Sequence, residues 1–265
     1  MVSQTPGSAE FIVPEWQVPE SIHAICTTRI GGYSAAPFDA FNLGLHVGDD
    51  LENVRLNREH LISTLQLPQA PSYLRQVHGT AVVRAENIPA NQPDQKTEPQ
   101  ADACWTHKSG SPIAIMTADC LAVLFASACG NYIAGAHAGW RGLAAGVLEA
   151  TVASLPVDAV ELTAWLGPAI GPDHFEVGAE VREQFMNCDA SSHEHFVPVD
   201  SKSAHGAEKK YTADIFGLAR DRLRAVGVGS VCGGNLCTYS DSKTFFSHRR
   251  DSGQTGRMAA VIWKD

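Results

Sequence analysis

The sequence predicts an α+β fold in which mixed β-sheets are flanked by helices. Two observations predict this class. Short apolar runs of strand length follow one another directly in one part of the chain, and elsewhere they are separated by segments with helical spacing. Such an arrangement favours a mixed sheet over a purely parallel one. Apolar segments of similar character continue through all 265 residues, so we expect a single domain over residues 1–265.

The first predicted helix spans residues 50–65, where acidic residues stand at the start and apolar residues recur on one face. Three apolar runs, at 113–117, 121–126 and 131–136, are predicted as buried strands. The last of these runs ends directly before His137.

From residue 143 the pattern changes to helical spacing, which predicts a helix over 143–155. The remaining predicted elements are strands at 162–166 and 258–263 and helices at 176–187 and 213–226. The polar stretches 87–100 and 189–209 are predicted as loops.

The composition of the chain argues against nucleic acid and membrane as partners. The chain has 29 acidic and 20 basic residues, a formal net charge of −9, which argues against the clustered basic footprint of a nucleic-acid-binding protein. The longest largely apolar run, 120–129, is about half the ~20 residues that a membrane-spanning helix needs. Residues 1–11 lack the features of a signal peptide. We therefore expect a cytoplasmic protein with a small-molecule substrate, whose seven cysteines are free thiols or metal ligands.

Three residues at the ends of short segments are candidate metal ligands: His78, Cys120 and His137. Imidazole and thiolate groups suit zinc, and copper is possible. Three protein ligands would leave a fourth position open, as in catalytic zinc sites. Their spacing alone is also compatible with a histidine satisfied in the core and a cysteine that only packs.

Asp119, beside Cys120 at a strand end, is a second catalytic candidate. Its carboxylate could orient a ligand or carry a proton. The alternative is that it caps the turn through local hydrogen bonds.

Arginines near turns are candidates for binding an anion. Arg141 follows His137 in a glycine-rich segment that leads into a helix, a place where backbone N–H groups attract anions. Arg249 or Arg250 could hold a phosphate or a ribose hydroxyl, with an ion pair to Asp251 as the structural alternative.

Asn42 and His46 are further candidates for substrate binding. They offer amide and imidazole groups within one turn near the start of the chain. Ordinary turn chemistry is the alternative explanation for both.

Together these stretches resemble the YfiH family, also called the laccase-domain or multicopper polyphenol oxidase family. The matching segments run in order along almost the whole chain: FNLGLHVGDD (41–50), RQVHG (75–79), TADCLAVLF (117–125), GAHAGWRGLAAGV (135–147), GPAIGP (167–172), FEVG (175–178), NLCTY (235–239), FFSHRRD (245–251) and TGRMAAVIW (255–263).

The resemblance implies a single α+β domain and a metal, usually zinc, held by His78, Cys120 and His137. It also implies phosphorolysis of adenosine, inosine and methylthioadenosine, and deamination of adenosine; some bacterial members are linked instead to peptidoglycan precursors. The chain departs from its relatives at Ala169, where many carry a cysteine.

The function expected first is therefore a zinc-dependent purine nucleoside phosphorylase that takes phosphate as second substrate and also deaminates adenosine, a reaction suited to zinc because the metal can lower the pKa of water to about 7. A copper-dependent polyphenol oxidase is one alternative, although only His193 and His195 form a His-x-His pair. A second is a hydrolase of peptidoglycan precursors with Cys120 as nucleophile and His137 as base. A third is a protein without enzymatic activity, in which the metal only stabilises the fold. The sequence leaves the oligomeric state open.

Overall fold

The computed structural model describes residues 8–89, 92, 94–199 and 209–265. Its main helices are α1 (Leu51–Leu65), α2 (Trp140–Ala145), α3 (Val147–Ser154), α4 (Ala179–Cys188) and α5 (Ile215–Ala225). The strands are β1 (Phe11–Ile12), β2 (Ile22–Thr27), β3 (Val82–Arg84), β4 (Ala103–Thr106), β5 (Ile113–Thr117), β6 (Leu121–Ser127), β7 (Ile133–Ala138), β8 (Leu162–Leu166), β9 (Glu176–Gly178), β10 (Phe196–Pro198), β11 (Lys210–Ala213), β12 (Ser230–Gly233) and β13 (Met258–Lys264).

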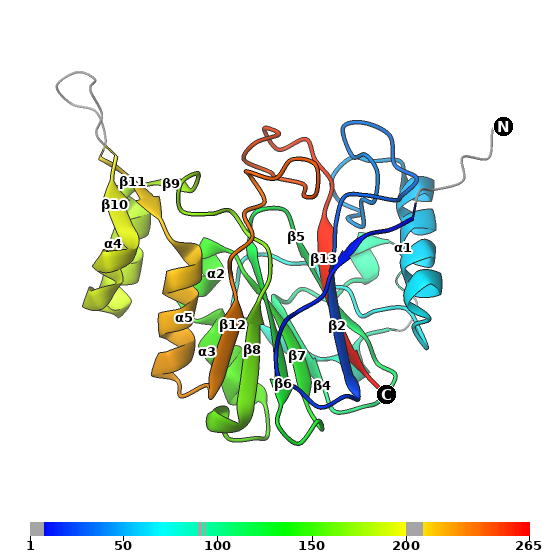
Figure 1. Ribbon diagram of the computed structural model, residues 1–265, viewed down its shortest axis with the longest axis horizontal. Helices are drawn as coiled ribbons and strands as arrows, with labels where there is room; N and C mark the ends of the chain where they lie inside the picture. Colours follow the sequence, from blue (N-terminus) through cyan, green and yellow to red (C-terminus); the bar gives the residue numbers. More distant parts are fainter. Residues whose placement is uncertain (1–7, 90–91, 93, 200–208) are drawn as a thin grey trace.

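The strands form three sheets. A six-stranded sheet has the order β12-β8-β6-β7-β4-β3, and its two outer pairs are parallel whereas the inner pairs are antiparallel. An antiparallel four-stranded sheet has the order β1-β2-β13-β5. A small sheet, β10-β11-β9, lies beside α4 at one end of the molecule (Figure 1). The α+β class with mixed sheets flanked by helices is thus confirmed.

The two large sheets face each other and are covered by helices on their outer sides (Figure 1). Alternate residues of β6 show this arrangement: Val123 belongs to the core shared with α2, α3 and α5, whereas Leu124 belongs to the core between the sheets. A third core, containing Leu61 of α1 and Val261 of β13, lies beyond the four-stranded sheet. A strand covered on both faces is apolar at every position, which is why β6 reads as a continuous apolar run.

Three predicted helices have different bounds in the structure. The helix predicted over 213–226 is α5, which begins at Ile215 because Ala213 of β11 pairs with Phe196 of β10 and Asp214 caps the helix. The segment 143–155 is interrupted at Gly146, whose φ of 97° ends α2 and begins α3. The prediction for 176–187 was wrong at its start, because residues Glu176–Gly178 pair with β11 as strand β9 before α4 begins. In contrast, α1 begins where predicted, with Asp50 accepting hydrogen bonds from the backbone N–H groups of Glu52 and Asn53.

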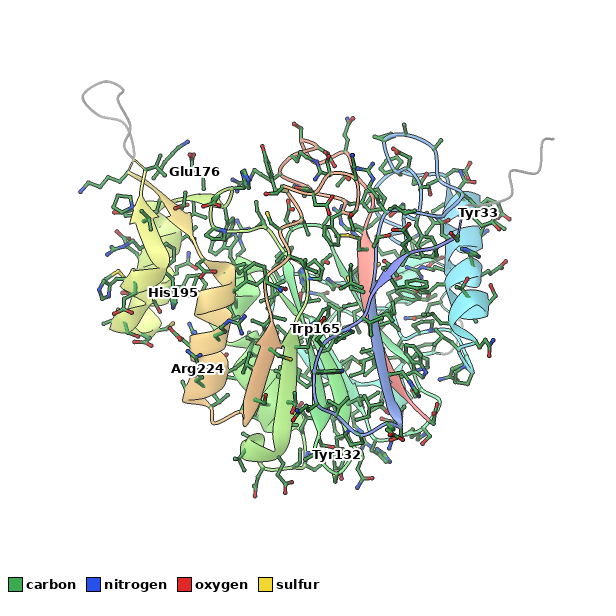
Figure 2. All side chains as sticks on the ribbon, in the orientation of Figure 1. Tyr33, Tyr132, Trp165, Glu176, His195 and Arg224 are labelled. Carbon is green, nitrogen blue, oxygen red and sulfur yellow. The ribbon has the colours of Figure 1, made fainter. Side chains whose placement is uncertain are left out.

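The two predicted loops contain short regular elements. Residues Gln95–Thr97 form a 3₁₀ turn in the first loop. In the second, a 3₁₀ segment at Ala190–His195 leads into β10, and residues 200–208 lie outside the described part of the chain. Within the described residues, no helix is long and apolar enough to cross a membrane. Side chains fill the space between the layers, for example Trp165 of β8 (Figure 2).

Candidate metal centre

The candidate ligands meet where the chain passes from one large sheet to the other. Strand β5 of the four-stranded sheet ends at Thr117, and β6 of the six-stranded sheet begins at Leu121. Cys120 is the last residue of this short connection. On the neighbouring strand β7, His137 pairs with Ala122, two residues beyond Cys120. The antiparallel register therefore brings Cys120 and His137 to the same end of the sheet.

His78 lies in a loop that two sets of hydrogen bonds hold in place. The carboxylate of Asp102 accepts hydrogen bonds from the backbone N–H groups of Val77 (3.2 Å), His78 (2.8 Å) and Gly79 (2.7 Å). The side-chain amide of Gln76 pairs with the backbone of Met116 in β5, at 2.7 and 2.9 Å. These bonds hold His78 in a left-handed conformation with φ 61°, which is uncommon for a residue other than glycine.

The three ligand atoms lie within 4.8 Å of one another. The Sγ atom of Cys120 lies 3.6 Å from Nε2 of His78. The rings of His78 and His137 meet edge to face, with their centroids 4.8 Å apart. Bond lengths of about 2.0 Å to nitrogen and about 2.3 Å to sulfur place the ligands of a tetrahedral zinc about 3.5 Å apart. The donor set and its spacing therefore fit a zinc ion, and they are also compatible with copper.

Asp102 orients the second histidine as well. Its Oδ1 atom accepts a hydrogen bond of 2.9 Å from Nδ1 of His137, whose side chain is buried. A carboxylate on Nδ1 directs the other ring nitrogen, Nε2, toward the cluster, an arrangement that recurs among metal-binding histidines. One buried carboxylate thus fixes the positions of two ligands.

The electrostatics of the cluster favour a cation. Burial alone would raise the pKa of the Cys120 thiol, but the neighbouring His137 and His78 lower it to about 6. Burial would likewise lower the pKa of His137, but Cys120 and Asp102 raise it to about 9. Near neutral pH the metal-free pair is consequently a thiolate beside an imidazolium, and a thiolate is the form of cysteine that binds metal.

Asp119, the second candidate catalytic residue, accepts hydrogen bonds with both carboxylate oxygens. Its Oδ1 atom accepts a hydrogen bond of 2.6 Å from the hydroxyl of Thr238, and Oδ2 accepts one of 2.7 Å from the backbone N–H of Arg249. The side chain thereby ties two C-terminal segments to the β5–β6 connection. The carboxylate that bonds to the metal-ligand residues is Asp102, which the sequence prediction missed because residues 103–106 were not recognised as a strand.

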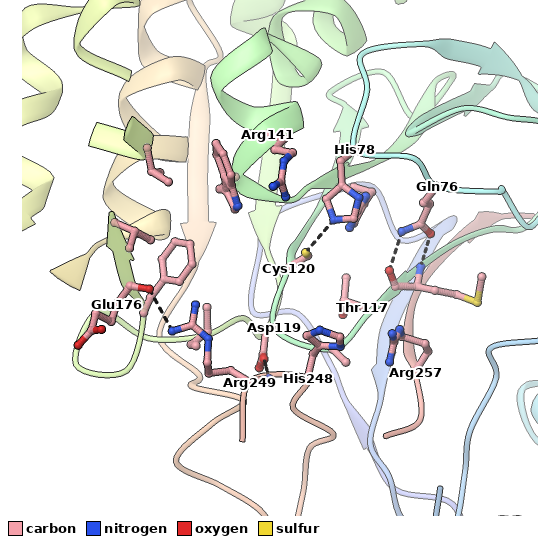
Figure 3. A pocket seen from close by; sticks show the side chains of 18 of the residues that line it. Gln76, His78, Thr117, Asp119, Cys120, Arg141, Glu176, His248, Arg249 and Arg257 are labelled. Atoms are coloured by element: carbon pink, nitrogen blue, oxygen red, sulfur yellow. Dashed lines mark hydrogen bonds between the residues drawn. The ribbon is translucent and has the colours of Figure 1, made fainter. Parts of the chain in front are cut away.

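A cavity of about 620 Å³ opens beside the three ligands, which is within the range of small-molecule sites. Figure 3 shows His78 and Cys120 on its wall together with basic side chains from distant parts of the chain. The structure brings together in its lining the predicted residues His46, His78, Asp119, Cys120, His137, Arg141 and Arg249, and adds residues that the prediction missed, among them Gln76, Thr117, His248 and Arg257.

The two arginines predicted to bind an anion, Arg141 and Arg249, have exposed side chains, and each contacts a neighbouring residue. The guanidinium of Arg141 lies 4.4 Å from the ring centre of Trp140. Arg249 donates a hydrogen bond of 3.0 Å from Nη1 to the backbone oxygen of Glu176, as Figure 3 shows. Arg250 points elsewhere: it forms the ion pair with Asp251 at 2.8 Å that was considered as the structural alternative.

Asn42 lies outside the cavity lining and is fully buried. Its Oδ1 atom accepts hydrogen bonds from the backbone N–H groups of Gly44 (2.9 Å) and Arg257 (2.8 Å), and its Nδ2 donates to Asp49 (2.9 Å). These bonds hold the turn and the backbone of Arg257 in place, and the contact of Asn42 with substrate stays a prediction. His46, from the same turn, does reach the cavity, where the surrounding protein and the charge of Arg257 lower its pKa to about 4.

The lone His-x-His pair is distant from this cavity. His195 lies beside α4 and α5 at the edge of the molecule, where its Nε2 pairs with Asp221 at 2.6 Å (Figure 2). His193 contacts the backbone oxygen of Ala190 at 2.9 Å. Across the described ranges, His78, Cys120 and His137 form the single cluster of three or more such side chains spaced to hold an ion.

Comparison with known proteins places this site in a family. Residues 23–265 match the family described as multi-copper polyphenol oxidoreductase laccase. The chain is 48% identical over 255 residues to the purine nucleoside phosphorylase YfiH of Escherichia coli, covering 96% of this chain and 99% of that protein. It is 49% identical over 253 residues to a purine nucleoside phosphorylase of Pseudomonas aeruginosa, covering 96% and 98%. The chain belongs to the YfiH family.

Solved structures agree with this assignment. A Neisseria meningitidis protein of the same family superposes with a TM-score of 0.87 at 43% identity, covering 96% of this chain and 99% of that one. A Bacillus licheniformis protein, YfiH, superposes with a TM-score of 0.89 at 27% identity, covering 97% of both chains.

Proposed function

We propose that this protein is a zinc-dependent purine nucleoside phosphorylase that acts on adenosine, inosine and methylthioadenosine and also deaminates adenosine. The observation that carries the proposal is the cluster of His78, Cys120 and His137 at the wall of a cavity lined by arginines. It is supported by relatives of nearly full length that are named purine nucleoside phosphorylases. The seven free cysteines are consistent with action in the cytoplasm.

The residues divide the chemistry between them. His78, Cys120 and His137 would hold the metal, which when bound supplies a Lewis acid in the cavity. Phosphorolysis forms a bond from a phosphate oxygen to ribose C1′ while the bond from C1′ to N9 of the purine breaks. Guanidinium groups of the cavity hold the phosphate for this displacement and offset its negative charge. The predicted candidates for this role are Arg141 and Arg249.

The test separates the two reactions by their need for phosphate. Zinc-loaded protein is incubated with each nucleoside, with and without phosphate, and products are separated by chromatography. Phosphorolysis releases the free base and ribose 1-phosphate only when phosphate is present, whereas deamination of adenosine yields inosine in either case. Elemental analysis of the protein as purified identifies the metal.

Two variants and one control complete the design. Cys120→Ala and His137→Gln should abolish both metal binding and turnover, whereas Arg55→Gln, on the exposed side of α1, should change neither. Zinc-loaded protein that produces neither free base nor inosine would remove the proposal. Copper in stoichiometric amount together with oxidation of phenols would favour the oxidase.

A further inference from the structure

Thr117, a residue of the cavity lining, carries a buried hydroxyl without a hydrogen-bond partner among the described residues. Its side chain is only 2% exposed, and its Oγ1 atom has no hydrogen-bond partner within the described part of the chain. Thr117 is the last residue of β5, three positions before Cys120, and it lines the same cavity as the three ligands. An unpaired buried hydroxyl is destabilising, and its presence in a native protein calls for an explanation, such as a bound ion or an ordered water.

Arg257 places a positive charge at the same end of the sheet. It directly precedes Met258, which pairs with Thr117 across β13 and β5. No carboxylate of the described residues lies within 4.0 Å of its guanidinium, unlike the seven arginines that form ion pairs. Figure 3 shows Arg257 and Thr117 directed into the region between His248 and Gln76. Burial lowers the pKa of Arg257, although Cys120 and Asp119 oppose this shift.

The surrounding residues hold this arginine in place. Nη1 donates to the backbone oxygens of Thr255 (3.1 Å) and Gly256 (3.0 Å), and the backbone N–H donates to Asn42. Gly44 leaves room for the side chain, because a Cβ atom at that position would lie 2.8 Å from Cγ of Arg257. The turn that contains Asn42 and Gly44 thus serves to position a cation, and part of the guanidinium has no hydrogen-bond partner among the described residues.

We infer that Thr117 and Arg257 form the phosphate-binding subsite of the cavity. The inference rests on the proposed phosphorolysis for its choice of ligand. A hydroxyl donor and a guanidinium fork both match the oxygens of a tetrahedral oxyanion. Arg141 and Arg249 are exposed, so water and salt screen their attraction for an anion. Arg257 is partly buried, and its charge therefore acts on a ligand through a medium of lower polarity than bulk water.

The test measures binding of inorganic phosphate in the absence of nucleoside. Phosphate is titrated calorimetrically into zinc-loaded wild-type protein and into two pairs of variants. Thr117→Val removes the hydroxyl at nearly constant shape, and Thr117→Ser retains it. Arg257→Gln removes the charge, and Arg257→Lys retains it without the fork. Arg55→Gln, which removes a charge outside the cavity, is the matched control.

We expect Thr117→Val and Arg257→Gln to weaken phosphate binding about tenfold or more, while Thr117→Ser and Arg55→Gln bind like the wild type and Arg257→Lys is intermediate. Because the Thr117 hydroxyl has no structural partner, Thr117→Val should keep or raise the melting temperature. Equal phosphate affinity in Thr117→Val and wild type would overturn the inference, as would a loss of affinity confined to Arg141→Gln or Arg249→Gln. So would wild-type protein that does not bind phosphate saturably.

The binding assay also separates this inference from the proposed function. Phosphate binding that depends on Thr117 and Arg257, in a protein that releases no base from any nucleoside, would retain the subsite and remove the phosphorylase. Phosphorolysis whose KM for phosphate is unchanged in Arg257→Lys and Thr117→Val would retain the phosphorylase and remove the subsite.

Discussion

The two parts of the cavity wall differ in how completely their polar groups are satisfied. Around His78 and His137, the carboxylate of Asp102 accepts hydrogen bonds from three backbone N–H groups and from one imidazole. Around Thr117 and Arg257, a buried hydroxyl and part of a guanidinium have no partner in the described chain. The proposed metal site is thus the preorganised part, whereas the proposed phosphate subsite keeps hydrogen-bonding capacity free for a ligand.

The largest effect should come from Asp102, on which the organised part of the wall depends. In Asp102→Asn the amide nitrogen would face N–H donors in a fully buried position. We expect the variant to lose about 3 kcal/mol of unfolding free energy and to bind zinc about 10- to 100-fold more weakly. Denaturant titration and competition with a chromophoric chelator measure the two quantities.

A matched carboxylate–histidine pair provides the control. Asp221 contacts His195 at 2.6 Å, but its side chain is 40% exposed. Asp221→Asn should therefore leave zinc affinity unchanged and alter stability only slightly. Wild-type zinc affinity in Asp102→Asn would show that the ligands keep their positions without this carboxylate. That result would contradict the contrast drawn between the two parts of the cavity wall.

Adjacent arginines allow a second comparison. The guanidinium of Arg250 bonds to Asp251 and to the backbone oxygens of Thr238 (2.7 Å) and Phe245 (2.8 Å), so Arg250→Gln should cost about 2 kcal/mol of stability. Arg249 is exposed at the cavity, and Arg249→Gln should change stability by less than about 0.5 kcal/mol. Denaturation and steady-state kinetics on both variants test this division. Equal loss of stability in the two would contradict it.

Zinc binding should release protons, and the number released should depend on the pH. In the metal-free protein, the pKa of Cys120 is about 6 and that of His137 about 9, each held there by the other's charge. At pH 7.5 the pair carries one proton, on His137, which zinc must displace; below pH 6 the thiol carries a second. We expect the pair to release about one proton at pH 7.5 and more at pH 5.5, and zinc affinity to fall as the pH falls. Calorimetry in buffers of different ionisation enthalpy counts the protons, and release of none at pH 7.5 would contradict the assigned charges.

The sequence predicted the parts of the fold whose pattern is local. Strand β6 is buried on both faces and α1 has an acidic cap, so both are visible in short windows. Strands β2 and β4 were missed, since nothing in their own residues marks them as pairing with distant strands such as β13 and β7.

The same distinction applies to the site. Spacing alone did not join the metal ligands, because their meeting depends on the register of β6 and β7 and on the hydrogen bonds around His78; the family resemblance supplied that information. Asp102 and Arg257 were missed because their roles arise from contacts between segments that lie far apart in the chain. Such partners become visible only when hydrogen bonds and burial are known.

The smallest effect is expected at the His-x-His pair, which tests the oxidase hypothesis directly. His193 and His195 bond to Ala190 and Asp221 and lie outside the cavity lining. Replacing both with glutamine should leave the metal content and the turnover of nucleosides unchanged, and because the His195 pair is partly exposed, stability should fall by about 1 kcal/mol or less. An oxidase with several coppers would need histidines beyond the three ligands. If copper content falls in this variant while the cluster of His78, Cys120 and His137 is intact, the pair binds copper and the single-ion description of the protein is wrong.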